Sequence, residues 1–449
     1  MFNIFNDKLE SAGQIDVSEV KLVNHAGMTI DLSSMWVEIE IYESIFSPCM
    51  SGAITIHDKY NLARNFPLIG VETLYLTYKT PTVEDEVRKK FRIYDMSVKE
   101  RIPGKEEMIL TLQFVSERHL MDQSTKISRS FKNKKWSEIA RTIFRDYLLS
   151  DEERDPGVEV LFDFSLIQEK LVVQDDTLAP TSVVIPNWSP FHALNWICGK
   201  AEHYGNCDYV FFEGLDVSYF VSLSYFKNLP PVATYKYNTE KVERNVGKDV
   251  NIEIKKILQY AEVLNGNNKF EMDAEGLFAS RMIVHDVTFK TIQEKDFSYI
   301  KDFNDDKVVR LSKHPIAPLT YVASVSPLHR LYYKQKSSFA FSNIRQQYDP
   351  FHSQKRNSQL LRNNGKVLNV EVFGDTRRKV GQILNIEITS PEFLIAKSQA
   401  NVLDGSLSGK YMVSSIGHKI RKQDGHFMGL ELIKDSFEEP IPDEVNLSR

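Results

Sequence analysis

Short stretches in which apolar and polar residues alternate occupy the first part of the chain. Residues 37–42 alternate strictly and residues 51–57 less strictly, which gives each stretch one buried face if it forms a strand. The pattern continues over residues 70–78, and two further stretches flank a Pro-Gly turn at residues 102–105. Five or six short strands separated by turns predict a barrel or a sandwich over residues 1–118.

The pattern changes to helical spacing after this block. In residues 136–147 apolar side chains recur at steps of three and four, which predicts an amphipathic helix. A second helix is predicted over residues 189–205, because its Ser-Pro start suits a helix cap followed by the first helical position. A hairpin is predicted at residues 208–226. Residues 119–235 are therefore expected to form a mixed α/β insert.

Strand patterns return in two blocks, residues 236–294 and 366–436, which are predicted to form a second barrel together. Residues 250–254 and 281–289 show the clearest alternation in the first block. In the second block, alternating stretches begin at glycines or follow Gly-containing turns, as expected of short antiparallel strands.

The segment between these blocks is polar and irregular. Residues 295–365 are rich in Asp, Lys, Ser, Asn and Gln, which predicts an arm of loops and short helices, and residues 437–449 form an acidic, proline-broken tail. The two strand-rich ends share an order of elements, from a first strand to a closing hairpin. An internal duplication would produce this order, and so would coincidence between two β domains of low residue identity.

Composition narrows the class of protein. A chain of 449 residues exceeds the size of one hydrophobic core, and 42% hydrophobic with 26% charged residues is typical of a folded globular protein. The net charge is only -5 and the basic residues are scattered, which disfavours general nucleic-acid binding. Three cysteines give no disulfide framework, and no signal-like or membrane-spanning apolar run is seen, so we expect neither export nor membrane insertion.

Catalytic and ligand-binding signatures are missing from the sequence. The phosphate loop, the dinucleotide fingerprint, the zinc-protease helix and the nucleophile elbow are all absent. The closest histidine pair, His418 and His426, lies across a predicted hairpin without a third ligand nearby. We therefore predict no catalytic, cofactor-binding or metal-binding residues, and no cofactor.

Two groups of residues could carry chemistry and have simpler explanations. Cys198 and Cys207 bracket a segment that contains His203, so a Cys–His nucleophile is conceivable, but buried free thiols are the better interpretation. The carboxylates of Glu38 and Glu40 share one strand face, with Glu43 following, as in a glycoside hydrolase pair. A solvated or channel-facing strand edge explains them better.

Aromatic and basic residues also gather in places. The predicted hairpin at 208–226 holds seven aromatic residues, which could stack on sugars but are better explained as core. Basic residues at 132–135 and 355–362 could contact DNA phosphates, and we interpret them as solvated faces or contacts to acidic partners.

Two segments resemble a known family. Residues 43–58, followed by an Asn-Leu pair and by residues 66–72, resemble the N-terminal barrel of baseplate hub proteins from contractile-tailed phages. Residues 409–420, continued by residues 430–436, resemble the closing hairpin of that family, which is related to the base of type VI secretion spikes.

The resemblance implies a mainly β fold with an α+β insert, in which one chain carries two tube-like antiparallel β-barrels. It implies a homotrimer whose barrels form a pseudo-sixfold ring, with the tail tube protein above and the central spike protein below. Wedge and tape measure proteins are further candidate partners, and genome DNA would pass through the channel without specific binding. We expect a non-enzymatic protein of the virion baseplate, assembled in the host cytoplasm. A tail-associated cell-wall hydrolase or a receptor-binding tail protein is the alternative.

Overall fold

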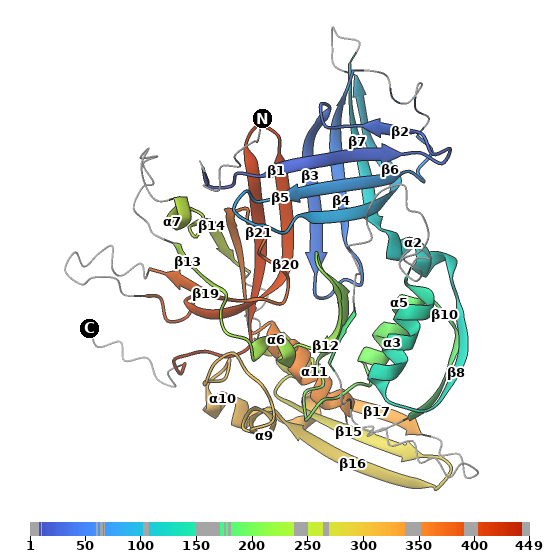
Figure 1. Ribbon diagram of the computed structural model, residues 1–449. Helices are drawn as coiled ribbons and strands as arrows, with labels where there is room; N and C mark the ends of the chain where they lie inside the picture. Colours follow the sequence, from blue (N-terminus) through green and yellow to red (C-terminus); the bar gives the residue numbers. More distant parts are fainter. Residues whose placement is uncertain are drawn as a thin grey trace, which may run out of the picture.

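Four groups of secondary structure make up the computed structural model, and strands dominate it, as predicted (Figure 1). The structure describes residues 9, 11–59, 62, 66, 68–101, 107–149, 171–174, 177, 181–237, 250–263, 269–336, 352–389 and 403–441. The predicted turn at residues 102–105 lies outside these residues. No helix in this described part is long and apolar enough to cross a membrane.

The N-terminal group is a strongly curved antiparallel sheet, called here the first barrel-like sheet. Its strands are β1 (Asp16–Val23), β2 (Thr29–Asp31), β3 (Trp36–Ser44), β4 (Ser51–Asp58), β5 (Thr73–Lys79), β6 (Val87–Arg101) and β7 (Met108–Ser116). The alternation predicted from the sequence holds for Ile39 and Ile41 of β3, which are buried, but not for Val37, which is exposed because the register of β3 shifts between Trp36 and Glu38. Inward side chains from all the long strands share one hydrophobic core.

The second barrel-like sheet contains strands from two distant parts of the chain. They are β13 (Ala233–Tyr237), β14 (Ile257–Glu262), β18 (Lys366–Phe373), β19 (Ile383–Ile388), β20 (Gly409–Arg421) and β21 (Gly425–Lys434). A parallel backbone bridge between Lys236 of β13 and Lys256, which directly precedes β14, connects the two strands at the ends of this sheet. All of its pairs are antiparallel except β13 with β19, which is parallel.

The two barrel-like sheets have the same strand order. With β2 set aside, the hydrogen-bonded order in the first sheet is β3-β4-β7-β6-β5-β1, and in the second it is β14-β18-β21-β20-β19-β13. In both cases the strands follow the order second, third, sixth, fifth, fourth, first along the chain. The shared order of elements predicted for the two ends is therefore present in the fold itself.

The insert packs helices against short sheets around a core of its own. Its elements are α2 (Glu117–Ser124), β8 (Ile127–Lys134), α3 (Trp136–Tyr147), β9 (Leu171–Val173), β10 (Thr181–Trp188), α5 (Pro190–Cys198), β11 (Tyr209–Glu213), β12 (Ser218–Ser222) and α6 (Ser224–Lys227). Helix α5 starts as predicted, with Ser189 at the cap and Pro190 in the first turn. It ends earlier than predicted, at Cys198, because Gly199 caps it and a tight turn follows.

The fourth group lies below the others in Figure 1 and has its own three-stranded sheet and core. Its elements are α8 (Lys269–Ala274), β15 (Ala279–Asp286), β16 (Thr291–Ser298), α9 (Tyr299–Phe303), α10 (Leu319–Ser324), η2 (Pro327–His329), β17 (Leu331–Lys336) and α11 (His352–Asn363). The short helix α7 (Val250–Glu253) precedes β14 and lies beside it, at the second barrel-like sheet (Figure 1).

Two sequence predictions in this region were wrong. Residues 250–254, predicted as a strand, begin with the helical turn α7, because alternation over five residues does not distinguish a strand from a helical turn. Residues 281–289 do contain a strand, β15, but it pairs with β16 and β17 and not with the second barrel-like sheet. The alternating pattern shows that β15 has one buried face and does not show which sheet it joins.

Candidate functional site

The two barrel-like sheets are joined edge to edge into one continuous sheet. The second half of β20 pairs with β3 in antiparallel register, with Ser415 opposite Ser44, Gly417 opposite Tyr42 and Lys419 opposite Glu40. The first half of β20 pairs with β19 of its own unit, so this long strand belongs to both sheets. This junction places one polar face across strands of both units.

Ion pairs lie on the solvent-exposed face of the junction, called here the polar face. Lys419 Nζ lies 2.9 Å from Glu38 and 3.1 Å from Glu40, and Arg421 lies 3.3 Å from Glu38. The hydroxyl of Tyr42 donates to Glu40 at 2.8 Å. Glu38 and Glu40 share a strand face, as predicted, and both are held in ion pairs across the junction.

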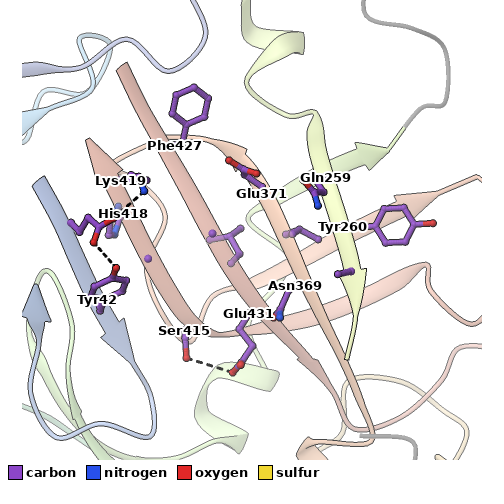
Figure 2. A pocket seen from close by; sticks show the side chains of 16 residues that line it. Tyr42, Gln259, Tyr260, Asn369, Glu371, Ser415, His418, Lys419, Phe427 and Glu431 are labelled. Atoms are coloured by element: carbon purple, nitrogen blue, oxygen red, sulfur yellow. Dashed lines mark hydrogen bonds and ion pairs between the residues drawn. The ribbon is translucent and has the colours of Figure 1, made fainter. Parts of the chain in front are cut away.

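A hollow of 490 Å³ lies on this face, lined by β3, β20, β21, β18 and β14 (Figure 2). Two glycines lie opposite each other in its floor, Gly417 of β20 and Gly429 of β21. A side chain at Gly429 would meet nothing within 4 Å, and the ring of Tyr42 lies against Gly417. The hollow therefore exists because these strands carry no side chains at its centre.

The charge of the hollow is negative. Three carboxylates, those of Glu40, Glu371 and Glu431, line it together with one ammonium group, that of Lys419. Burial acts to raise the pKa of Glu40, but the hydrogen bonds from Tyr42 and Lys419 outweigh it and hold that pKa below its ordinary value. Hydrogen bonds to Glu38 and Glu40 raise the pKa of Lys419. Both partners are thus charged at neutral pH.

A buried polar cluster lies behind the same junction. His418 Nδ1 is 3.1 Å from His426 Nε2, and His418 Nε2 is 3.4 Å from a carboxylate oxygen of Glu43. All three side chains are essentially inaccessible to solvent. Burial, together with the neighbouring His418, holds the pKa of His426 well below its ordinary value. The histidine pair seen in the sequence is therefore an internal contact between β20 and β21 of the second unit, and Glu43 of β3 connects it to the first unit.

The tip of the β11–β12 hairpin fills the space between the two units. Leu215 enters the first core and its N–H donates to Glu43 at 3.1 Å, while Phe212 packs in the second core. Glu213 forms a buried ion pair with Arg118 at 2.9 Å. The hairpin thus fixes the relative position of both units from behind the polar face.

Comparison with solved structures identifies related folds. A tail protein from Neisseria meningitidis MC58 aligns with a TM-score of 0.53 and 12% identity, covering 93% of this chain and 96% of that one. The 43 kDa tail protein of prophage MuSo2 from Shewanella oneidensis aligns with a TM-score of 0.50 and 10% identity, covering 93% and 98%. The chain has the fold of these tail proteins. The resemblance predicted from residues 43–72 and 409–436 is confirmed at the level of the fold.

Sequence comparison gives no further assignment. No protein-family model matches the chain, and no curated protein matches it. The tail-protein fold is therefore identified from the structure, and the functional residues must be found in this chain itself.

The other candidate residues occupy structural positions within the tail-protein fold. Cys198 and Cys207 are buried free thiols, and burial raises the pKa of Cys198 to about 12. Most aromatic residues of the 208–226 hairpin are buried, as the interpretation of these residues as core predicts. The basic segments at 132–135 and 355–362 differ in their exposure to solvent. Lys132 and Lys134 are exposed, whereas Arg362 is only 1% exposed.

Sequence reasoning missed the junction itself. The β20–β3 pairing joins residues from opposite ends of the chain, and no local pattern specifies which strand edge meets which. The available signal was the opposite charge of the two strands, because one carries Glu38 and Glu40 and the other carries Lys419 and Arg421.

Proposed function

We propose that the chain is a structural hub of a phage tail baseplate, which forms a homotrimeric, pseudo-sixfold ring between the tail tube and the central spike. The observation that carries this proposal is the repeat: two units of identical strand order are joined edge to edge in one chain. A trimer of such a chain would present six similar units around one axis.

The junction inside the chain suggests how copies would join. Within the chain, the fifth strand of the second unit, β20, pairs with the second strand of the first unit, β3. The corresponding strands for the next junction are β6 and β14. Strand β6 pairs with β5 only up to Arg92, and β14 pairs with β18 along one edge. Apart from the bridge of Lys236 to Lys256 at the start of β14, no ladder in the described part of the chain covers the remaining edge of either strand.

Repeating the internal pairing between copies closes a ring. The second half of β6 in one copy would pair with β14 in the next, and three such junctions would alternate with three internal ones. Such an interface joins two different surfaces of neighbouring copies. The ring closes when a whole number of copies completes one full turn. Edge strands left open in a monomer are aggregation-prone, so a ring also explains why they are tolerated.

The polar face would line the channel of that ring. A negatively charged wall repels the phosphate backbone, so DNA would pass without specific binding. The carboxylates considered for hydrolysis are in ion pairs across the junction, which favours a mechanical over a catalytic role. Tail tube, spike, wedge and tape measure proteins would then bind the ends and rim of the ring in the virion.

Cysteine cross-linking tests the proposed junction. Ser97 of β6 and Ala261 of β14 are both exposed in the monomer, and the double variant Ser97→Cys/Ala261→Cys should give a covalent trimer on oxidation. The matched control moves the first cysteine to exposed Thr29 of β2, another strand of the same sheet, and should stay uncross-linked. A monodisperse monomer at micromolar concentration, alone and mixed with tube and spike proteins, would refute the proposal.

A further inference from the structure

A tight turn places Glu202 and Cys207 side by side. The backbones of His203 and Asn206 exchange hydrogen bonds of 3.0 and 2.9 Å, and the two residues between them, Tyr204 and Gly205, have φ of 46° and 89°. Positive φ at both central residues is the geometry of a two-residue hairpin turn. The residues on either side of that bonded pair, Glu202 and Cys207, are therefore neighbours across the hairpin.

Helix α11 is fixed against this turn by hydrogen bonds between its side chains and the backbone of the turn. The N–H of Cys207 donates to Gln359 at 2.7 Å, and Gln359 donates in return to the carbonyl of Gly205 at 2.9 Å. Arg356 donates to the carbonyl of Cys207 at 2.7 Å. These contacts hold the first residue of the helix, His352, at the turn.

The side chain of His352 is oriented by the turn as well. Its Nε2 lies 3.1 Å from the carbonyl oxygen of Ala201. A carbonyl can only accept, so Nε2 carries the proton and the neutral ring has its lone pair on Nδ1. Metal-binding histidines usually have their second ring nitrogen fixed in this way.

Three potential ligand atoms meet at this point. A carboxylate oxygen of Glu202, Sγ of Cys207 and a ring nitrogen of His352 all lie within 4.8 Å of one another. We propose that Glu202, Cys207 and His352 bind a divalent cation of the zinc type, with water as the fourth ligand. Thiolate, imidazole and carboxylate are the ligands that Zn²⁺ takes in tetrahedral sites.

The burial of Cys207 and the charge of the site favour a role as a metal ligand over a role as a catalytic nucleophile. The thiol is completely buried, where a substrate could not reach it, and burial raises its pKa well above the ordinary value. A catalytic cysteine needs a lowered pKa and access. A bound Zn²⁺ deprotonates a coordinating thiol outright, and one thiolate with one carboxylate neutralises the ion inside the protein.

A metal ion bound at this site would link the insert to the fourth group. Glu202 and Cys207 belong to the turn after α5, whereas His352 begins α11. Ligand-spacing rules applied to the sequence predicted no metal site, because His352 lies far from the other two residues along the chain. The fold brings the three together.

Cobalt binding tests the proposal on the full-length protein. After removal of metals with a chelator, Co²⁺ should bind at one equivalent per chain and give the thiolate-to-cobalt absorption band of one cysteine ligand. Excess Zn²⁺ should remove the band. Cys207→Ser should abolish it, whereas the matched variant Cys198→Ser, which also replaces a buried thiol, should keep it.

Two further measurements keep the test decisive if Cys207→Ser does not fold. Glu202 is only half-buried, so Glu202→Gln should keep the circular dichroism of the wild type and bind Co²⁺ more than about 100-fold more weakly. In the wild type, Zn²⁺ should raise the melting temperature. Absence of the cobalt band in the wild type, or its persistence in Cys207→Ser, overturns the proposal.

Discussion

Arg362 of α11 is one of the largest side chains that the fold buries completely. Its guanidinium lies 3.7 Å from Asp302 and 3.9 Å from Asp435, distances that give charge pairing without close hydrogen bonds. Lys227 joins the same cluster, 2.8 Å from Asp435. The basic segment at 355–362 was predicted to be solvated or to contact acidic partners. Arg362 has acidic partners within its own chain, and the prediction of a solvated face is wrong for this residue.

Asp435 is the residue on which this buried cluster depends. Asp435→Asn leaves Lys227 and Arg362 without their shared carboxylate, so the free energy of unfolding should fall by about 3–5 kcal/mol. Urea denaturation at neutral pH measures it. The exposed Asp424, paired loosely with Arg421, provides the control, and Asp424→Asn should change stability by less than about 1 kcal/mol. Equal losses in both variants would contradict the prediction.

The same cluster should respond to strong acid. Burial opposes ionisation of Asp435, but Lys227 and Arg362 outweigh it and lower its pKa to about 2 from 3.8. A carboxyl whose pKa is lowered by folding stabilises the protein above the unfolded pKa. That contribution, on the order of 2 kcal/mol, is lost as the pH falls from about 4 through 2. Asp435→Asn should lack this part of the pH dependence.

At the scale of elements, the turn between β18 and β19 packs directly on β21. Gly374 leaves no room for a side chain, because a methyl group there would overlap the ring of His426. Gly429 lies on β21 itself and faces the open hollow. Gly374→Ala should therefore reduce stability by about 1–3 kcal/mol through overpacking, whereas Gly429→Ala should be close to neutral. Thermal unfolding of the two variants distinguishes them, and a neutral Gly374→Ala would show that the turn can move away.

The junction of the two units should weaken in mild acid. The pKa of His426 is held well below 6.5 by burial and by His418, so the folded protein keeps this ring neutral while the unfolded chain binds a proton. Stability is then complete above about pH 6.5 and falls below it, by up to about 1.4 kcal/mol per pH unit. The facing groups on β20 and β3 are His418 and Glu43.

Replacing His426 tests this pH dependence. The variant His426→Gln carries no charge at any pH, so its free energy of unfolding should vary less between pH 5 and 7 than that of the wild type. His25 is exposed on the first unit, and His25→Gln should keep the wild-type slope. An unchanged slope in His426→Gln would assign the acid sensitivity to another group.

Local patterns predicted the elements of this fold better than their partners. Alternation located β3, β18 and β21, and the Ser-Pro start located α5, because these signals lie within a few residues of sequence. The same alternation could not assign β15 to its own sheet. The same limit applied to the candidate site residues. The sequence predicted that Glu38 and Glu40 share one strand face, but it did not predict their ion-pair partner Lys419, which comes from the far end of the chain.

At the scale of the whole molecule, the repeated strand order and the junction of the two units together create one polar face that extends over both units. Two units of one strand order share a continuous sheet, and the acidic hollow lies across their boundary. The buried hairpin tip behind the boundary keeps both units in fixed orientation. A rigid pair of units in which β6 and β14 have edges without a ladder, among the residues that the structure describes, is suited to ring formation, because each copy contributes a fixed rotation.

The charge of the polar face allows a test of whether it lies inside a ring. The double variant Glu371→Lys/Glu431→Lys reverses two carboxylates of the hollow, so the assembled protein should bind DNA with a strong dependence on salt. If the face lines a closed channel, linear DNA can thread into it and closed circular DNA cannot. The control Glu294→Lys/Asp306→Lys reverses two exposed carboxylates outside the hollow and should bind both forms equally. Gel shifts with the two DNA forms measure this, and equal binding of circular DNA by the first variant would place the face on the outside.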